Sequence, residues 1–200
     1  MKKLAMVLAV LVIAMVAVSC AGTTVKRVET DTVMDLSGRW NDTDAQLVAE
    51  QMVKEMLERP WLRRFLKDTG KEPRVIVGDI RNKTEEHIEV ETFRKDIEKE
   101  LTNSGDVRFV ASAAEREEIR KEREDMQEYS SESTMKQFKK EIAADFMLKG
   151  VITSISDAAA GKKVIYYQID LELFDTESNE KAWVGQKKIK KIIDKPGIGF

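Results

Sequence analysis

Apolar residues recur at intervals of three and four between residues 42 and 59, which predicts a helix with a broad buried face. Asp42 or Thr43 is placed to cap its first turn, and Pro60 ends the run. Similar periodicity predicts four more helices, over residues 61–69, 90–103, 113–128 and 132–144.

The last third of the chain alternates as strands do. From Ile165 to Leu173 every second residue is apolar, and most residues between them are polar or charged. Gly161 marks a hairpin before this strand and Ser178-Asn179 marks another after it. Strands are predicted over residues 73–80, 107–110, 146–156, 163–174 and 182–193.

The last two strands can pair so that acid meets base and apolar meets apolar. The register that does so sets Asp170 opposite Lys188, Ile169 opposite Ile189 and Glu172 opposite Gln186. The elements together predict an α/β (α+β) sandwich. Its sheet is mostly antiparallel with a long C-terminal three-stranded meander, and helices pack on one face while the other face is partly wet.

The first twenty residues have the pattern of a bacterial lipoprotein signal. Lys2 and Lys3 precede an uncharged apolar run that ends at Val18. As a helix this run rises about 22 Å, which is short of the ~30 Å hydrocarbon core of a membrane. Small and apolar residues then lead into Cys20, as in a lipobox. We expect residues 1–19 to be removed and Cys20 to be lipidated, with acyl chains that anchor the protein.

The composition of the remaining chain indicates where the tether, the globular domain and the tail begin and end. Residues 20–32 are polar and aperiodic and are expected to form a lipidated tether, followed by one globular domain over 33–194 and a tail over 195–200. Cys20 is the only cysteine, so the domain has no disulfide. Ala21, rather than aspartate, follows it, which favours sorting to the outer membrane.

Charge argues against one class of partner. Loss of Lys2 and Lys3 with the signal takes the formal charge from −2 to −4, so no basic field indicates nucleic acid.

Three separated segments, in order, resemble the LpoB-type activators of penicillin-binding proteins. The first runs from Thr32 to Asp44 and contains Arg39-Trp40-Asn41-Asp42. The second is Val75-Ile76-Val77-Gly78-Asp79-Ile80-Arg81-Asn82-Lys83-Thr84, and the third is Ala144-Asp145-Phe146-Met147-Leu148-Lys149-Gly150 with the hairpin that ends at Trp183-Val184-Gly185.

This resemblance implies a fold like the N-terminal domain of TolB. It also implies an outer-membrane lipoprotein that faces the periplasm, binds a class A peptidoglycan synthase and raises its activity. The family supplies no catalytic residues.

The candidate partner-binding residues lie in two of these segments: Arg39, Trp40, Asn41, Asn82 and Lys83. Tryptophan and arginine dominate many protein interfaces, and a loop after a strand end often carries recognition. The alternative is local architecture, in which Trp40 packs at the helix entry, Asp42 caps it and Arg39 pairs with an acid.

Enzyme chemistry has little support in the sequence. No phosphate-binding loop, HExxH motif or nucleophile motif is present, and no cofactor is expected. The single histidine, His87, lacks a recognisable set of metal ligands around it. Asp170 and Glu172 lie about 7 Å apart on one strand face, a separation that glycosidases use, but a salt-bridged wet face is the simpler interpretation.

Two other functions remain open. One is a CsgG-like secretion-channel subunit, although Lys187-Lys188-Ile189-Lys190-Lys191 is too basic for a lipid-facing strand. The other is a structural envelope lipoprotein that only binds peptidoglycan.

Overall fold

A computed structural model describes residues 25–29, 32–129 and 143–194. The predicted signal peptide, Cys20 and the tail over 195–200 lie outside these residues, as does most of the helix predicted over 132–144, whose last two residues are not helical. The chain divides into two compact units, residues 1–33 and 34–200. The described part of the first unit has no helix or strand.

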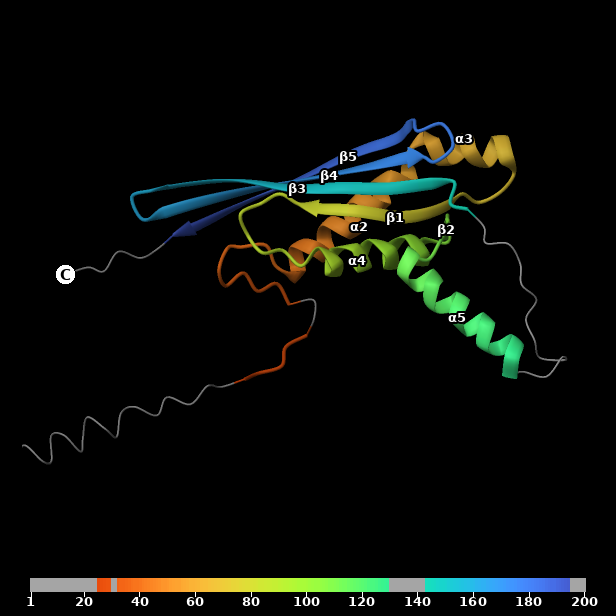
Figure 1. The fold of residues 1–200 in the computed structure, drawn as a ribbon. Coiled ribbons are helices and arrows are strands. Elements are labelled where there is room, and N and C mark those ends of the chain that lie inside the picture. The colour runs from red at the N-terminus through yellow and green to blue at the C-terminus, as the bar shows by residue number, and fades with distance from the viewer. Residues whose placement is uncertain (1–24, 30–31, 130–142, 195–200) are drawn as a thin grey trace, which may run out of the picture. The chain divides into compact units, whose positions relative to one another are not determined.

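Five strands form one sheet in the order β2-β1-β3-β4-β5 (Figure 1). The three long strands at its C-terminal side form the antiparallel meander that the alternating pattern predicts, while β1 joins β3 and β2 in parallel. The bounds are β1 Arg74–Asn82, β2 Arg108–Phe109, β3 Phe146–Ala159, β4 Lys162–Asp175 and β5 Lys181–Asp194. The strand predicted over residues 73–80 therefore continues to Asn82, so Arg81 and Asn82 end β1 and the loop begins at Lys83.

The predicted register of β4 and β5 is wrong by two residues. Lys188 lies opposite Gln168, and Asp170 lies opposite Gln186. The connection between the strands is tighter than predicted, because the Asp175 N–H donates to the Glu180 carbonyl. A shift of two residues keeps every side chain on its predicted face, since the side-chain period of a strand is two.

The described helices are α2 Asp42–Glu58, α3 Pro60–Thr69, α4 Val90–Ser104 and α5 Ala113–Tyr129. The cap of α2 is Asn41, not Asp42 or Thr43. The Asn41 side chain accepts from the Asp44 N–H at 3.0 Å, and the Asp44 carboxylate accepts from the Asn41 N–H at 3.1 Å. This reciprocal capping box satisfies two free amide groups of the first turn. Gly70 ends α3 in the left-handed conformation.

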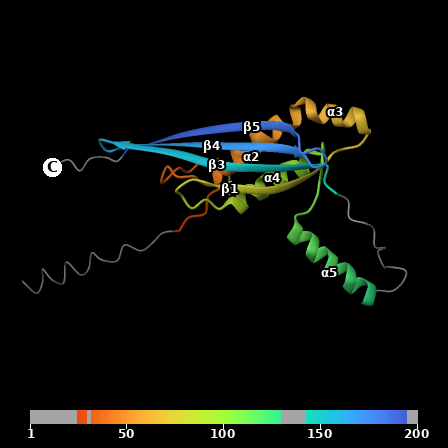
Figure 2. The same ribbon diagram turned by 45° about the horizontal axis from the view of Figure 1, so that its top comes forward.

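Helices α2 and α4 lie together on one face of the sheet, and the core fills the space between the layers (Figure 2). The inward face of β4, from Ile165 to Leu173, is buried. Trp61 of α3 contacts the Phe146 ring edge-on and covers the end of the core. The opposite face of β4 carries the half-exposed residues Tyr166, Gln168, Asp170 and Glu172, so the prediction of one covered and one wet face is confirmed.

Candidate functional site

The chain segment before α2 is held on the sheet by a buried lysine of β5. Lys191 has an exposed fraction of 8%, and its Nζ lies 2.6 Å from Asp44 Oδ2 and 3.0 Å from Asp35 Oδ2. It also donates to the Arg39 carbonyl at 2.9 Å. Gly38 lies against Ile193 in the left-handed conformation, and a Cβ there would collide with the isoleucine side chain. The segment therefore follows one path over β5.

A second network joins this segment to the loop after β1. The Tyr167 hydroxyl donates to Glu86 Oε2 at 2.7 Å and accepts from the Trp40 N–H at 3.0 Å. The Trp40 ring meets the Phe93 and Tyr167 rings edge-on, with centroids 5.9 and 5.8 Å away. Burial and the bond to Glu86 raise the pKa of Tyr167 above its ordinary value, so the hydroxyl keeps its proton and remains a donor.

Asn82 organises the turn that contains Glu86. Its Nδ2 donates to the Glu86 carbonyl at 2.7 Å, and its Oδ1 accepts from the N–H and the hydroxyl of Thr84 at 2.9 and 2.8 Å. This is an Asx-type turn, in which the side chain replaces backbone hydrogen bonds. The loop before α2 and the loop after β1 thus lie side by side through Tyr167 and Glu86.

The five candidate residues divide into two kinds. Trp40, Asn41 and Asn82 are partly buried and hold the two loops in shape, which is the local architecture considered above. Arg39 and Lys83 are exposed. In the part of the chain that the structure describes, Arg39 has no acidic partner, so the expected pairing with an acid is not observed. Of the five candidate residues, Arg39 and Lys83 are therefore the two whose side chains another molecule could contact.

The sequence indicated the two loops but not the residues that join them. Tyr167 was predicted as core, and nothing in its alternating strand marks the hydroxyl as a bridge. Lys191 carried a signal, because it occupies an inward position of β5 in phase with Trp183 and Ile189. A lysine at such a position needs an acidic partner.

The carboxylates on the wet face are engaged in ordinary polar contacts. Asp170 accepts from Gln168 at 2.8 Å and from Gln186 at 2.7 Å. Glu172 pairs with Lys181 at 2.7 Å. Glu172 is therefore salt-bridged to Lys181, whereas Asp170 accepts from two glutamines and lies opposite Gln186 instead of the expected Lys188.

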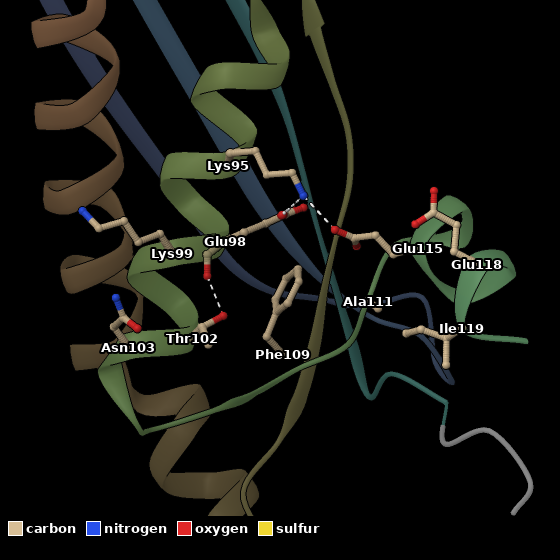
Figure 3. Close-up of a pocket in the computed structure, with 10 residues that line it drawn as sticks. All are labelled: Lys95, Glu98, Lys99, Thr102, Asn103, Phe109, Ala111, Glu115, Glu118 and Ile119. Atoms are coloured by element: carbon tan, nitrogen blue, oxygen red, sulfur yellow. Dashed lines mark hydrogen bonds and ion pairs between the residues drawn. The ribbon is translucent and has the colours of Figure 1, made fainter. Parts of the chain in front are cut away.

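A groove of about 700 Å³ separates α4 from α5 (Figure 3). Lys95 of α4 spans it, with its Nζ 2.7 Å from Glu98 and 2.8 Å from Glu115. Contact with Lys95, together with hydrogen bonds from Ser112, lowers the pKa of Glu115 to about 2. Lys95 therefore links α4 to α5 across the groove by ion pairs with Glu98 and Glu115.

Other sites have no support in the described ranges. Within them no three histidine, cysteine or acidic side chains are grouped so as to hold a metal ion. No helix in these ranges is long and apolar enough to cross a membrane.

A family model described as peptidoglycan-synthase activator LpoB matches residues 44–189. The chain belongs to the LpoB family. Members of this family are outer-membrane lipoproteins that face the periplasm and activate a synthase rather than act as enzymes. The match contains the second and third resembling segments and begins at Asp44, the last residue of the first, so Arg39, Trp40 and Asn41 lie outside it.

Several solved structures are similar in fold. The C-terminal domain of LpoB from Escherichia coli is 13% identical with a TM-score of 0.40, and the alignment covers 76% of this chain and 99% of that one. The NMR structure of E. coli LpoB is 13% identical with a TM-score of 0.42, covering 88% and 87%. Lipoprotein GNA1162 from Neisseria meningitidis is 11% identical with a TM-score of 0.36, covering 59% and 82%. A search of curated proteins found no match.

Proposed function

We propose that this chain is an outer-membrane lipoprotein that binds a class A peptidoglycan synthase and raises its activity without catalysing a reaction. Residues 1–19 are the signal peptide, Cys20 carries the lipid, and residues 20–32 are the tether of a domain over 33–194, with a tail over 195–200. The observation that carries the proposal is membership of a family of peptidoglycan-synthase activators, matched over residues 44–189.

The binding surface that we propose is centred on Arg39 and Lys83. They project from two loops that Tyr167 and Glu86 hold side by side. Arginine is enriched where proteins bind one another, and rigid loops lose little entropy on binding. Trp40, Asn41 and Asn82 contribute by fixing the loops. Activation then follows if the surface binds the active conformation of the synthase more tightly than the inactive one.

The test is co-purification of a class A synthase with the tagged full-length chain from cross-linked cells. We expect Arg39→Glu combined with Lys83→Glu to remove most of the synthase from the eluate. The matched control is Arg63→Glu with Arg64→Glu, which reverses two exposed cations on α3. Loss in both double variants would indicate a general charge effect, and retention of the synthase by the first double variant would contradict the proposed surface.

A further inference from the structure

One end of the β3–β4–β5 meander projects beyond α2 and α4 (Figures 1 and 2). On its wet face, Ile155 lies opposite Tyr166, and Val164 lies opposite Ile192 in the next row. The exposed fractions of Ile155 and Ile192 are 70% and 66%. Isolated exposed apolar residues are common on proteins, but these four form one cluster across three strands.

The edge of this cluster is basic. Lys188 and Lys190 lie on the same face of β5 as Ile192, opposite Gln168 and Tyr166, whereas Lys187 lies on the other face. None of these three lysines makes an ion pair with another described residue. Two acids lie on this face as well: Asp157 lies opposite Val164, in the same row as Ile192, and Asp194 lies 3.6 Å from Lys162.

Protection of a sheet edge does not account for this arrangement. Lysines on an edge strand such as β5 prevent pairing with other chains, and that would explain Lys188 and Lys190. Exposed isoleucines work in the opposite direction, because they favour association. Apolar side chains bordered by lysines, with a tyrosine among them, are typical of surfaces that rest at the boundary between lipid headgroups and acyl chains.

The attachment point of the tether lies at the same end of the meander. Residues 34–39 follow the far side of β5, where Lys191 binds Asp35 and Gly38 contacts Ile193. Met34 lies fourteen positions after Cys20, so the chain between them spans at most about 50 Å. An anchor at Cys20 therefore holds this end of the domain within about 50 Å of the membrane.

We propose that the projecting end of the meander, defined by Ile155, Val164, Tyr166, Lys188, Lys190 and Ile192, docks on an anionic membrane surface. The isoleucines enter the headgroup region and the lysines bind lipid phosphates. This inference rests on the proposed anchor at Cys20. Docking would fix the orientation of the domain and leave the loops with Arg39 and Lys83 to a protein partner.

The test places an environment-sensitive fluorophore on Ile155→Cys or Ile192→Cys in the full-length chain, reconstituted in vesicles through its own N-terminal segment. The parent chain, whose one cysteine is Cys20, gives the background signal. We expect a blue shift in vesicles that contain phosphatidylglycerol, a smaller shift in phosphatidylcholine alone, and a decrease at high salt. The control is Leu66→Cys on α3, another exposed apolar position, which should show no shift.

A second pair of variants tests the lysines. Lys188→Glu with Lys190→Glu should reduce the shift at Ile155→Cys at least threefold, because reversal of two charges opposes the attraction to phosphate. Equal shifts at residues 66 and 155, or no shift at either isoleucine position, would overturn the proposal. So would a shift that follows protein density and not lipid charge, because it would assign the face to a second copy of the chain.

Two further readouts separate this proposal from the proposed function. Mass spectrometry of Cys20 reports the anchor, and synthase binding by the same preparations reports the partner. A lipid-dependent shift without synthase binding would contradict only the proposed function. Synthase binding without the shift would contradict only the docking of the meander.

Discussion

Replacement of Lys191 by methionine tests how the segment before α2 is held. Methionine keeps most of the apolar stem but removes the charge that Asp44, Asp35 and the Arg39 carbonyl share. Asp44 is itself buried, with an exposed fraction of 8%. The variant therefore leaves a carboxylate in the protein interior without its cation, which is the costly way to break such a pair.

The expected loss in free energy of unfolding is about 3 kcal/mol. Removal of one partner of a buried ion pair costs roughly 3–5 kcal/mol. The lower end applies here because Asp44 still accepts from the Asn41 N–H at 3.1 Å, and because the Asp35 side chain has an exposed fraction of 42% and can return to water. Asp44→Asn in the same chain should recover about half of the loss, since an amide needs no cation.

The assay is urea unfolding of the full-length chain followed by tryptophan fluorescence. The midpoint should fall while the slope stays unchanged. Lys190→Met is the matched control, because the neighbouring lysine is exposed on the other face, and its effect should stay within about 0.5 kcal/mol. A loss below about 1 kcal/mol for Lys191→Met, or one equal to the control, would refute the buried-pair argument.

Three other predictions concern contacts that hold loops or helices of the domain together. Tyr167→Phe should lower the free energy of unfolding by about 2 kcal/mol in the same urea assay, because Glu86 loses a charge-assisted hydrogen bond; a neutral result would mean that this bond is not needed. Gly38→Ala should cost about 2 kcal/mol, since φ is +67°, and an unchanged midpoint would contradict the fixed path. The protection factors of the α5 amides, which compare the observed exchange rate with the intrinsic rate at each pH, should fall as pH falls from 4.5 toward 2, where Glu115 takes up a proton and releases Lys95. Glu115→Gln should remove that pH dependence.

The sign of the Glu115 effect follows from its lowered pKa. A carboxyl group that binds its proton less readily in the folded state contributes stability above the unfolded value of 4.5, and that contribution disappears as pH falls toward 2. Its size should be only a few tenths of a kcal/mol, because the side chain has an exposed fraction of 41%.

Local patterns predicted the elements of the fold well. The helices and the meander follow from periods of 3.6 and two, which depend on neighbouring residues alone. The register of β4 and β5 did not follow, because two registers that differ by two residues bury the same face. The choice between them is made by the turn at Asp175.

The candidate site was predicted only as two loops. The resemblance directed attention to Trp40 and Asn82, and the structure shows that both side chains mainly support the backbone around them. The contacts that bring the loops together come from Tyr167 and Glu86, which lie 81 residues apart in sequence. A pattern read along one strand does not reveal such a contact. The buried Lys191 is the exception, because the alternation of inward and outward residues along β5 already places it on the inward face.

The central claim is that this chain activates a peptidoglycan synthase. The most direct measurement is the glycosyltransferase rate of a purified class A synthase, with and without the full-length chain, at concentrations that saturate binding. We expect a higher rate with the intact chain, no increase with Arg39→Glu combined with Lys83→Glu, and the full increase with Arg63→Glu combined with Arg64→Glu. An unchanged rate with an intact chain that binds the synthase would contradict the claim.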